Sequence, residues 1–97
     1  MKHFLLIYTL APDYLERRAA LRKEHLDLTR EAADKGELLL GGALNPPDEA
    51  LLLFAGQGPE AAEAFARADP YVTQGLVTEW RVREWVTVAG KGAASEP

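Results

Sequence analysis

Residues 36–56 read GELLLGGALNPPDEALLLFAG. Two apolar runs, 37–44 and 50–55, lie on either side of the segment NPPDE at 45–49, and Asn, Pro and Asp are residues that favour turns. Each run is short, rich in leucine and bounded by Gly or Pro, which is typical of a buried β-strand rather than of a helix. The stretch therefore predicts a β-hairpin in the middle of the chain.

A strand and a helix are predicted before the hairpin. Residues 3–10 are apolar on both faces, as expected for a strand that is covered on both sides. Ala11-Pro12 ends this strand, and Asp13 is a good N-cap for a helix that continues to about Lys35. Gly36 follows at the position where helices commonly end on a left-handed residue.

A second helix and a last strand are predicted after the hairpin. Pro59 fits the first position of a helix that runs to about Ala68, and a short helical turn is expected next. Residues 76–88 alternate between apolar and polar, which indicates a strand. The small and polar residues 89–97 are expected to form a flexible C-terminal tail, so that the folded domain covers residues 1–88.

The predicted order of elements is βαββαβ. Such chains form an α+β, ferredoxin-like fold, in which a four-stranded antiparallel sheet carries two helices on one face. The other face would be open, yet Leu38, Leu39 and Leu40 cannot all point toward the helices. Because monomers rarely expose an apolar patch of this size, we expect a second copy of the chain to cover it in a homodimer.

Composition narrows the possible functions. The chain has 97 residues, a net charge of −4, 47% hydrophobic residues, two histidines and no cysteine. The acidic balance argues against nucleic acid as a partner, because such binding depends on attraction to phosphates. No apolar run approaches the roughly 20 residues of a membrane span and no signal peptide is recognisable, so we expect a soluble cytoplasmic protein that does not enter a membrane. No metal-ligand spacing and no cofactor motif is present, so neither a metal nor a cofactor is expected.

The first predicted helix carries a line of polar residues between two apolar stripes. Their spacing of four, three and four places them along one line of the helix, and they are Arg18, Arg22, His25 and Thr29. Histidine suits proton transfer because its ordinary pKa lies near neutral pH, and the arginines can hold a carboxylate or a phosphate. The other interpretation is that His25 is a hydrogen-bonded packing residue and that the arginine stems cover apolar surface.

Asp69 precedes Pro70 where the second helix is interrupted. An Asp at such a place is commonly a helix cap or part of an Asx-turn. In the predicted fold the two helices lie side by side, so the end of the second can approach the first. Asp69 can then accept a hydrogen bond from His25 and fix its tautomer, which is the orienting role in general acid–base catalysis.

Tyr8 is a third candidate. It lies in the middle of the first strand, on the same face as Phe4 and Leu6. If that face meets the first helix, its hydroxyl can reach the cleft and contact a substrate. The other interpretation is a core aromatic residue whose polar tip is hydrogen-bonded.

Three segments together resemble the YCII-related family. They are RKEHL at 22–26, GAL at 42–44 and DPY at 69–71, in this order on a βαββαβ chain. The resemblance extends over about residues 1–88. It implies a dimeric α+β barrel, related in fold to muconolactone isomerase-like and antibiotic-monooxygenase-like proteins.

The resemblance also implies a function for particular residues. The family's His–Asp pair lies in a cleft, is proposed as a catalytic dyad, and corresponds here to His25 and Asp69. Ala43 stands where the family pattern has a proline. One branch of the family eliminates chloride from a chlorinated hydroxyquinol. The residues that we expect to contact a substrate are Arg22, Gly42, Tyr71 and Tyr8.

Two main hypotheses for the function follow. The first is a cofactor-free enzyme that transfers a proton on a cyclic, anionic or phenolic small molecule, as an isomerase or a lyase. In it His25 is the base or acid, Asp69 orients the imidazole and Arg22 holds negative charge. The second is a dimeric binding or regulatory module that recognises a ligand in the same cleft without turnover; a purely structural subunit of a larger complex is a third.

Overall fold

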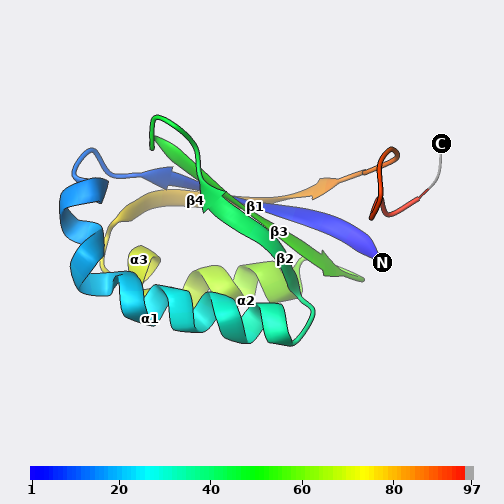
Figure 1. Cartoon of the computed structure of the whole chain (residues 1–97), viewed down its shortest axis with the longest axis horizontal. Coiled ribbons are helices and arrows are strands. Elements are labelled where there is room, and N and C mark those ends of the chain that lie inside the picture. Colours follow the sequence, from blue (N-terminus) through cyan, green and yellow to red (C-terminus); the bar gives the residue numbers. More distant parts are fainter. Residues whose placement is uncertain (96–97) are drawn as a thin grey trace.

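The secondary structure follows the predicted order, with the expected short helical turn before the last strand. The computed structural model describes residues 1–95. Its elements, drawn in Figure 1, are β1 (Lys2–Leu10), α1 (Tyr14–Asp34), β2 (Leu38–Ala43), β3 (Glu49–Gly56), α2 (Glu60–Ala68), α3 (Pro70–Thr73) and β4 (Val77–Trp85).

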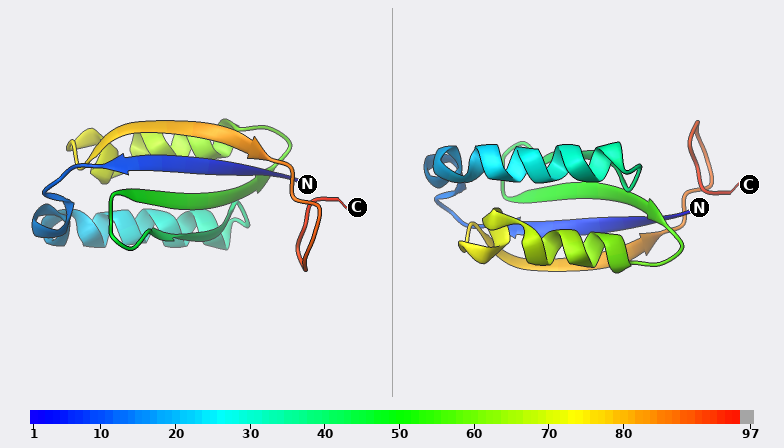
Figure 2. Two further views of the ribbon diagram at one scale, coloured as in Figure 1. Left: turned by 90° about the horizontal axis from the view of Figure 1, so that it is seen from above. Right: turned by 90° about the horizontal axis from the view of Figure 1, so that it is seen from below.

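The four strands form one antiparallel sheet in the order β2-β3-β1-β4. The two long helices lie side by side on one face of this sheet (Figure 2). The predicted hairpin is present, with Gly42 opposite Leu51 and Ala43 opposite Ala50. The ferredoxin-like fold is therefore confirmed. Strand β1 is central, between β3 and β4, which makes it the most enclosed position for a functional side chain.

The core lies between the sheet and the helices. Along β1 the buried residues alternate with half-exposed ones, as the two-residue period of a strand requires. Strand β3 shows the same alternation. The largest fully buried apolar side chains of this layer are Tyr8, Phe54, Leu6 and Leu76.

Most element ends lie within one residue of the sequence prediction, and two details differ more. Strand β4 ends at Trp85 rather than Val88, because Trp85 already pairs with His3 and β1 has almost no residues left to pair beyond it. Asp13 occupies the N-cap position of α1, but its side chain makes no capping hydrogen bond and instead lies 3.7 Å from Arg17. Gly36 ends the helix as predicted, with a φ of 78° that favours glycine.

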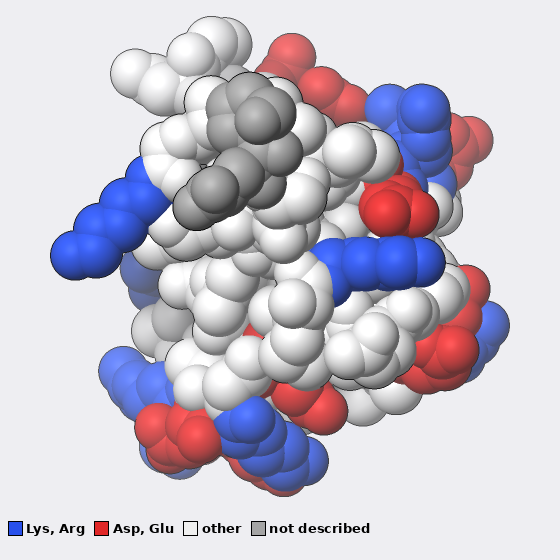
Figure 3. Space-filling view, turned by 90° about the vertical axis from the view of Figure 1, so that its right-hand side faces the viewer, with Lys and Arg blue, Asp and Glu red and all other residues white. Residues whose placement is uncertain are grey.

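The residues after β4 contain no further helix or strand up to residue 95. They turn back on themselves, since the backbone N–H of Ala94 donates to the hydroxyl of Thr87 at 2.7 Å. The flexibility expected for residues 89–97 stays a prediction, and residues 96 and 97 of that tail lie outside the described part of the chain. At the end of the molecule where the two termini lie, charged side chains of both signs lie mostly around the margin (Figure 3).

None of the helices described within residues 1–95 is long and apolar enough to cross a membrane.

The face of the sheet opposite the helices is apolar along β1, β2 and β3, whereas on β4 it carries Arg81 and Arg83, and no element described within residues 1–95 covers it. Leu5 and Ile7 of β1 lie opposite Leu53 and Leu51 of β3, and all four are half-exposed. Leu40 of β2 pairs with Leu53 on the same face and is 72% exposed. These contiguous leucine and isoleucine side chains form the second apolar face of the sheet, and the homodimer was predicted because such a face needs a cover.

We predict that a Lys at position 53 keeps the chain monomeric, whereas the unaltered chain is a dimer. Leu53→Lys places a charge in the middle of the open face, where a partner sheet would have to desolvate it. Sedimentation equilibrium at micromolar concentration should give about twice 10.6 kDa for the unaltered chain and 10.6 kDa for the variant. Ala20→Lys, on the exposed side of α1, is the matched control and should remain dimeric. An unaltered chain that sediments as a monomer would contradict the prediction.

Candidate active site

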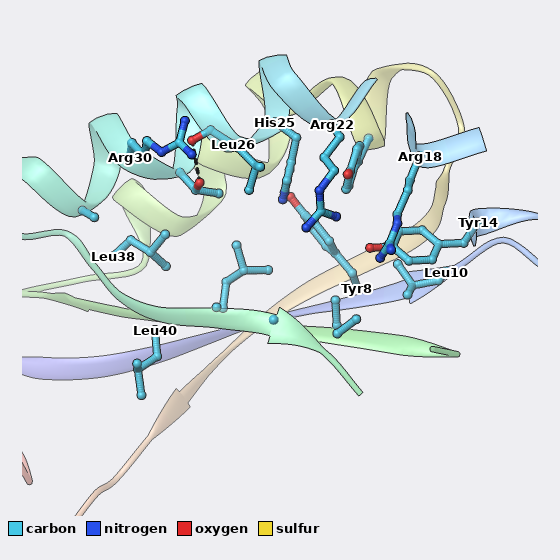
Figure 4. Close-up of a pocket in the computed structure, with 18 of the residues that line it drawn as sticks. Tyr8, Leu10, Tyr14, Arg18, Arg22, His25, Leu26, Arg30, Leu38 and Leu40 are labelled. Atoms are coloured by element: carbon cyan, nitrogen blue, oxygen red, sulfur yellow. Dashed lines mark hydrogen bonds between the residues drawn. The ribbon is translucent and has the colours of Figure 1, made fainter. Parts of the chain in front are cut away.

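A cavity of about 470 Å³ lies between α1 and β2. Figure 4 shows Arg18, Arg22 and His25 pointing from α1 toward the sheet, with Tyr8 beneath them on β1. The volume is within the range of small-molecule sites, roughly 300–1,000 Å³. The cavity therefore brings the polar line of the first helix and the candidate tyrosine of the first strand to one place.

His25 and Asp69 form the predicted pair. The imidazole Nδ1 lies 2.9 Å from Oδ1 and 3.0 Å from Oδ2 of Asp69, and the Asp69 side chain is completely buried. The short helix α3 packs against α1 and brings this carboxylate to the histidine, 44 residues away in sequence. Asp69 is also the N-cap of α3, with its side chain accepting from the backbone N–H of Tyr71. Its two sequence interpretations, helix cap and histidine partner, are thus both present in one residue.

The pairing fixes which nitrogen of the imidazole carries the proton. An ionised carboxylate only accepts hydrogen bonds, so Nδ1 of His25 must donate. In the neutral imidazole Nε2 is then the unprotonated nitrogen, and the ring lines the cavity. His25 is consequently arranged as a base, and the hydrogen bond from its Nδ1 to Asp69, on the core side of the ring, sets its orientation.

Two aromatic rings fix the plane of the imidazole. The ring of Tyr71 is stacked on that of His25, with centroids 3.9 Å apart and an interplanar angle of 4°. Phe65 of α2 approaches edge-on, at 6.4 Å and 78°. Together with the bond to Asp69, these contacts leave the imidazole little freedom to rotate. Phe65 was not predicted, because no residue pattern marks an ordinary core phenylalanine as a neighbour of the site.

Asp69 has a further hydrogen-bond donor that the sequence did not reveal. The hydroxyl of Tyr8 donates to Oδ2 of Asp69 at 2.8 Å, inside the core. Burial, and after it the neighbouring Asp69 carboxylate, raise the pKa of the Tyr8 hydroxyl far above its usual range. Tyr8 also lines the cavity. Its hydrogen bond to Asp69 is observed, whereas its contact with a substrate stays a prediction.

The cavity is cationic although the chain is acidic overall. Arg18, Arg22 and Arg30 line it, and none of the lining residues within the described chain is acidic. Arg30 lies 3.6 Å from Asp27, whereas Arg18 and Arg22 have no carboxylate within 4 Å among residues 1–95. Arg18 instead lies over the ring of Tyr14, 5.7 Å from its centroid. Two guanidinium groups are therefore available to an anionic ligand.

Small residues form part of the sheet side of the cavity, next to larger ones such as Leu38 and Leu52. Gly41 pairs with Leu52 and Ala43 with Ala50, and all of these residues line the cavity. A Cβ on Gly41 would lie 3.4 Å from the side chain of Leu52, whereas one on Gly42 would meet nothing within 4 Å. Gly42 lines the cavity as expected, and its role in binding a substrate stays a prediction. Small side chains here leave room for a ligand between the sheet and the arginines.

Tyr71 presents an unusual polar group. Its hydroxyl is buried and has no hydrogen-bond partner among residues 1–95. Burial, and after it the neighbouring Tyr14, raise the pKa of this hydroxyl, while Arg22 and Arg18 act in the opposite direction. The ring lines the cavity. The stacking of Tyr71 on His25 is thus observed, whereas a contact of Tyr71 with a substrate stays a prediction.

Within residues 1–95, no group of three or more His, Asp and Glu side chains is placed to hold a metal ion. The chain has no cysteine. That the site works without a metal or a cofactor stays a prediction.

The chain was compared with models of known protein families. The model of the YCII-related domain matches residues 1–86. The chain belongs to the YCII-related family. The match spans the whole sheet and all three helices, so the resemblance carried by the three short segments is confirmed.

Individual relatives agree with this assignment. Protein YciI of Escherichia coli O6:H1 is 34% identical over 86 residues, which cover 78% of this chain and 88% of the relative. The 5-chloro-2-hydroxyhydroquinone dehydrochlorinase TftG of Burkholderia phenoliruptrix AC1100, solved with 2,5-dihydroxybenzoquinone, has a similar structure, with a TM-score of 0.71 and 20% identity over 86% of this chain and 92% of that one. An antibiotic biosynthesis monooxygenase gives a TM-score of 0.56 and 13% identity over 92% and 100%. At these identities the two structures support the fold, that of the dimeric α+β barrels.

We predict that Asp69→Asn moves the titration midpoint of His25 downward relative to the unaltered chain. The substitution removes the negative charge that stabilises the protonated imidazole. Proton NMR of the imidazole resonances against pH measures the midpoint, and His3, whose Nδ1 is bonded to Thr87 far from the site, is an internal reference. Asp27→Asn removes one carboxylate from the exposed side of α1 and is the control. An equal shift in both variants would contradict a specific coupling.

Proposed function

We propose that the chain is a cofactor-free enzyme that transfers a proton on a small, cyclic, anionic or phenolic substrate, as an isomerase or a lyase. The observation that carries the proposal is the geometry at His25. Its Nδ1 is held by a buried carboxylate while the ring faces a cationic cavity. A base with a fixed tautomer, next to groups that stabilise negative charge, is the arrangement that proton abstraction needs.

The chemistry assigned to His25 begins at Nε2. In an isomerisation, Nε2 removes a proton from one atom of the substrate and the resulting imidazolium returns it at another. In an elimination, the electron pair freed by proton removal forms the new double bond, while the leaving group departs with its own bonding pair. Asp69 remains a carboxylate throughout and stabilises the imidazolium that forms between the two steps.

Arg22 is assigned to the negative charge of the substrate. It lies one helical turn before His25 and lines the same cavity. When a proton leaves a phenol or an activated carbon, the charge that develops on the ring oxygens is stabilised by a guanidinium group nearby. Arg18 is a second cation on the same side. Tyr8, Tyr71 and Gly42 complete the proposed set of substrate contacts.

The relative TftG suggests which compounds to try first. Its name describes removal of chloride from a hydroxylated ring, and it was solved with a planar dihydroxyquinone. A planar ring with acidic hydroxyl groups also suits a cavity that has glycine and alanine on one side and arginines on the other. Hydroxyquinols and hydroxyquinones, with and without a halogen, are therefore the first compounds to test as substrates of this chain.

We predict that His25→Gln lowers turnover of such a substrate by about 10²–10⁴-fold, the range for loss of a general acid or base. Chloride release from 5-chloro-2-hydroxyhydroquinone, and exchange of ring hydrogens for deuterium in heavy water followed by NMR, detect elimination and proton abstraction separately. Binding of 2,5-dihydroxybenzoquinone by calorimetry is measured in parallel and should be retained by the variant. If the unaltered chain binds this ligand but catalyses neither reaction on any hydroxyquinol tested, the non-catalytic ligand-binding module becomes the better account.

A second prediction concerns the anion site. Arg22→Ala should weaken binding of 2,5-dihydroxybenzoquinone by about 1.5–3 kcal/mol, the usual contribution of a hydrogen bond to a charged group. Lys23→Ala is a matched control, because it removes the same charge from the neighbouring residue, which is exposed and does not line the cavity. Calorimetric titration of both variants would show whether the effect is local. Equal losses in the two variants would indicate only long-range attraction.

A further inference from the structure

Tyr8 is held in place by the sheet. It lies in the central strand β1, between Ala50 of β3 and Trp80 of β4. Its side chain is 1% exposed and points toward the helix layer. From there its hydroxyl reaches Oδ2 of Asp69 at 2.8 Å. The donor is thus fixed by the sheet, whereas the acceptor lies on the connection between α2 and α3.

The carboxylate of Asp69 receives hydrogen bonds from three sides. Oδ2 accepts from Tyr8, Oδ1 accepts from the backbone N–H of Tyr71 at 3.0 Å, and both oxygens face Nδ1 of His25. The bonds from Tyr8 and Tyr71 hold the two oxygens in place independently of the histidine. They also leave the plane of the carboxylate turned so that both oxygens point at the imidazole.

Tyr8 is a neutral hydrogen-bond donor at neutral pH. Its pKa is raised by burial and by Asp69, so the hydroxyl does not ionise near neutral pH. A neutral donor on a carboxylate withdraws part of its charge and lowers its affinity for a further proton. The hydroxyl therefore competes with His25 for the negative charge of Asp69.

We propose that Tyr8 is a positioning residue that acts on His25 through Asp69, limiting how strongly the carboxylate stabilises the imidazolium. The consequence is a histidine that is oriented by a buried carboxylate whose negative charge is shared with a second side-chain donor. The effect on His25 rests on the observed hydrogen bonds to Asp69 and does not depend on the proposed function. Only its consequence for catalysis rests on the proposed function.

Other groups around the imidazole act on its charge as well. Arg22 and Arg18 of α1 line the same cavity and carry the same charge as an imidazolium, while Tyr71 from α3 contributes a neutral ring and Phe65 from α2 an apolar edge. Asp69 is the one carboxylate within 4 Å of an imidazole nitrogen of His25 among residues 1–95. A change at Tyr8 that leaves all of these in place therefore reports on the bond to Asp69.

The test is the His25 titration of Tyr8→Phe, followed by NMR. The substitution keeps the ring in the core and removes only the hydroxyl. With one donor fewer, Asp69 stabilises the imidazolium more strongly, so the midpoint should move upward, opposite in direction to the change in Asp69→Asn. Tyr14→Phe, which removes a hydroxyl from the same cavity that has no bond to Asp69, is the control for the titration and should leave the midpoint in place.

The outcomes separate positioning from a structural role. If Tyr8 only satisfies a buried carboxylate, Tyr8→Phe lowers the temperature of unfolding but leaves the His25 midpoint and the ¹⁵N signature of its Nδ1–H tautomer unchanged. That result, or a downward shift, would overturn the inference. Should Tyr8→Phe fail to fold, the same titration can be run with 3-fluorotyrosine incorporated at position 8 alone. Its more acidic hydroxyl is a stronger donor to Asp69 and should move the midpoint downward; an unchanged or higher midpoint would overturn the inference.

A kinetic measurement adds the catalytic consequence. In Tyr8→Phe, the acid limb of the kcat/KM profile for any hydroxyquinol that is turned over should move to higher pH than in the unaltered chain. If no compound is turned over, the proposed function fails while the NMR result still decides the role of Tyr8. If turnover is present but the acid limb does not move, the role of Tyr8 in catalysis is excluded.

Discussion

The buried carboxylate of Asp69 is the constraint on which the rest of the site depends. Removing a carboxylate from water costs several kcal/mol even after the protein relaxes, so it must be matched by hydrogen bonds of good geometry. Here the donors come from the central strand, the long first helix and the first turn of α3. One charge thus requires three elements, distant in sequence, to meet at a fixed place.

In this arrangement, negative and positive side chains lie on different sides of the imidazole of His25. A negative group lies behind His25 in the core, and two arginines without carboxylate partners in the described chain lie beside it in the cavity. The chain as a whole carries −4, so the cationic cavity is a local departure from its surroundings. A field of this kind attracts an anionic ligand and stabilises negative charge that develops on it. The small residues of β2 and β3 provide the space in which such a ligand can lie.

The sheet gives the site its rigidity. Tyr8 lies in β1, which is paired with β3 on one side and with β4 on the other, whereas the arginines are on the more exposed surface of α1. Groups that must hold a precise geometry are therefore on the most enclosed strand, and groups that must adapt to a ligand are on the long, flexible side chains. The opposite face of the same strand carries Leu5 and Ile7, so one element takes part both in the candidate site and in the surface expected to meet a second copy of the chain.

Local patterns in the sequence were enough for the secondary structure and for much of the candidate site. The hairpin, the left-handed end of α1 at Gly36 and the polar line that contains His25 depend on periods and residue types that are visible over a few residues. Topology then brought Asp69 close to His25, because two helices on one face of a sheet have few possible arrangements.

The sequence could not show that Asp13 does not cap α1, since a side-chain rotamer decides this, nor that β4 ends at Trp85, since this depends on where its partner strand ends. It could not show the hydrogen bond from Tyr8 to Asp69 or the stacking of Tyr71 on His25 either. Those contacts join side chains 61 and 46 residues apart, and they follow from sheet register and from the way α3 turns against α1, which only the packed tertiary structure decides.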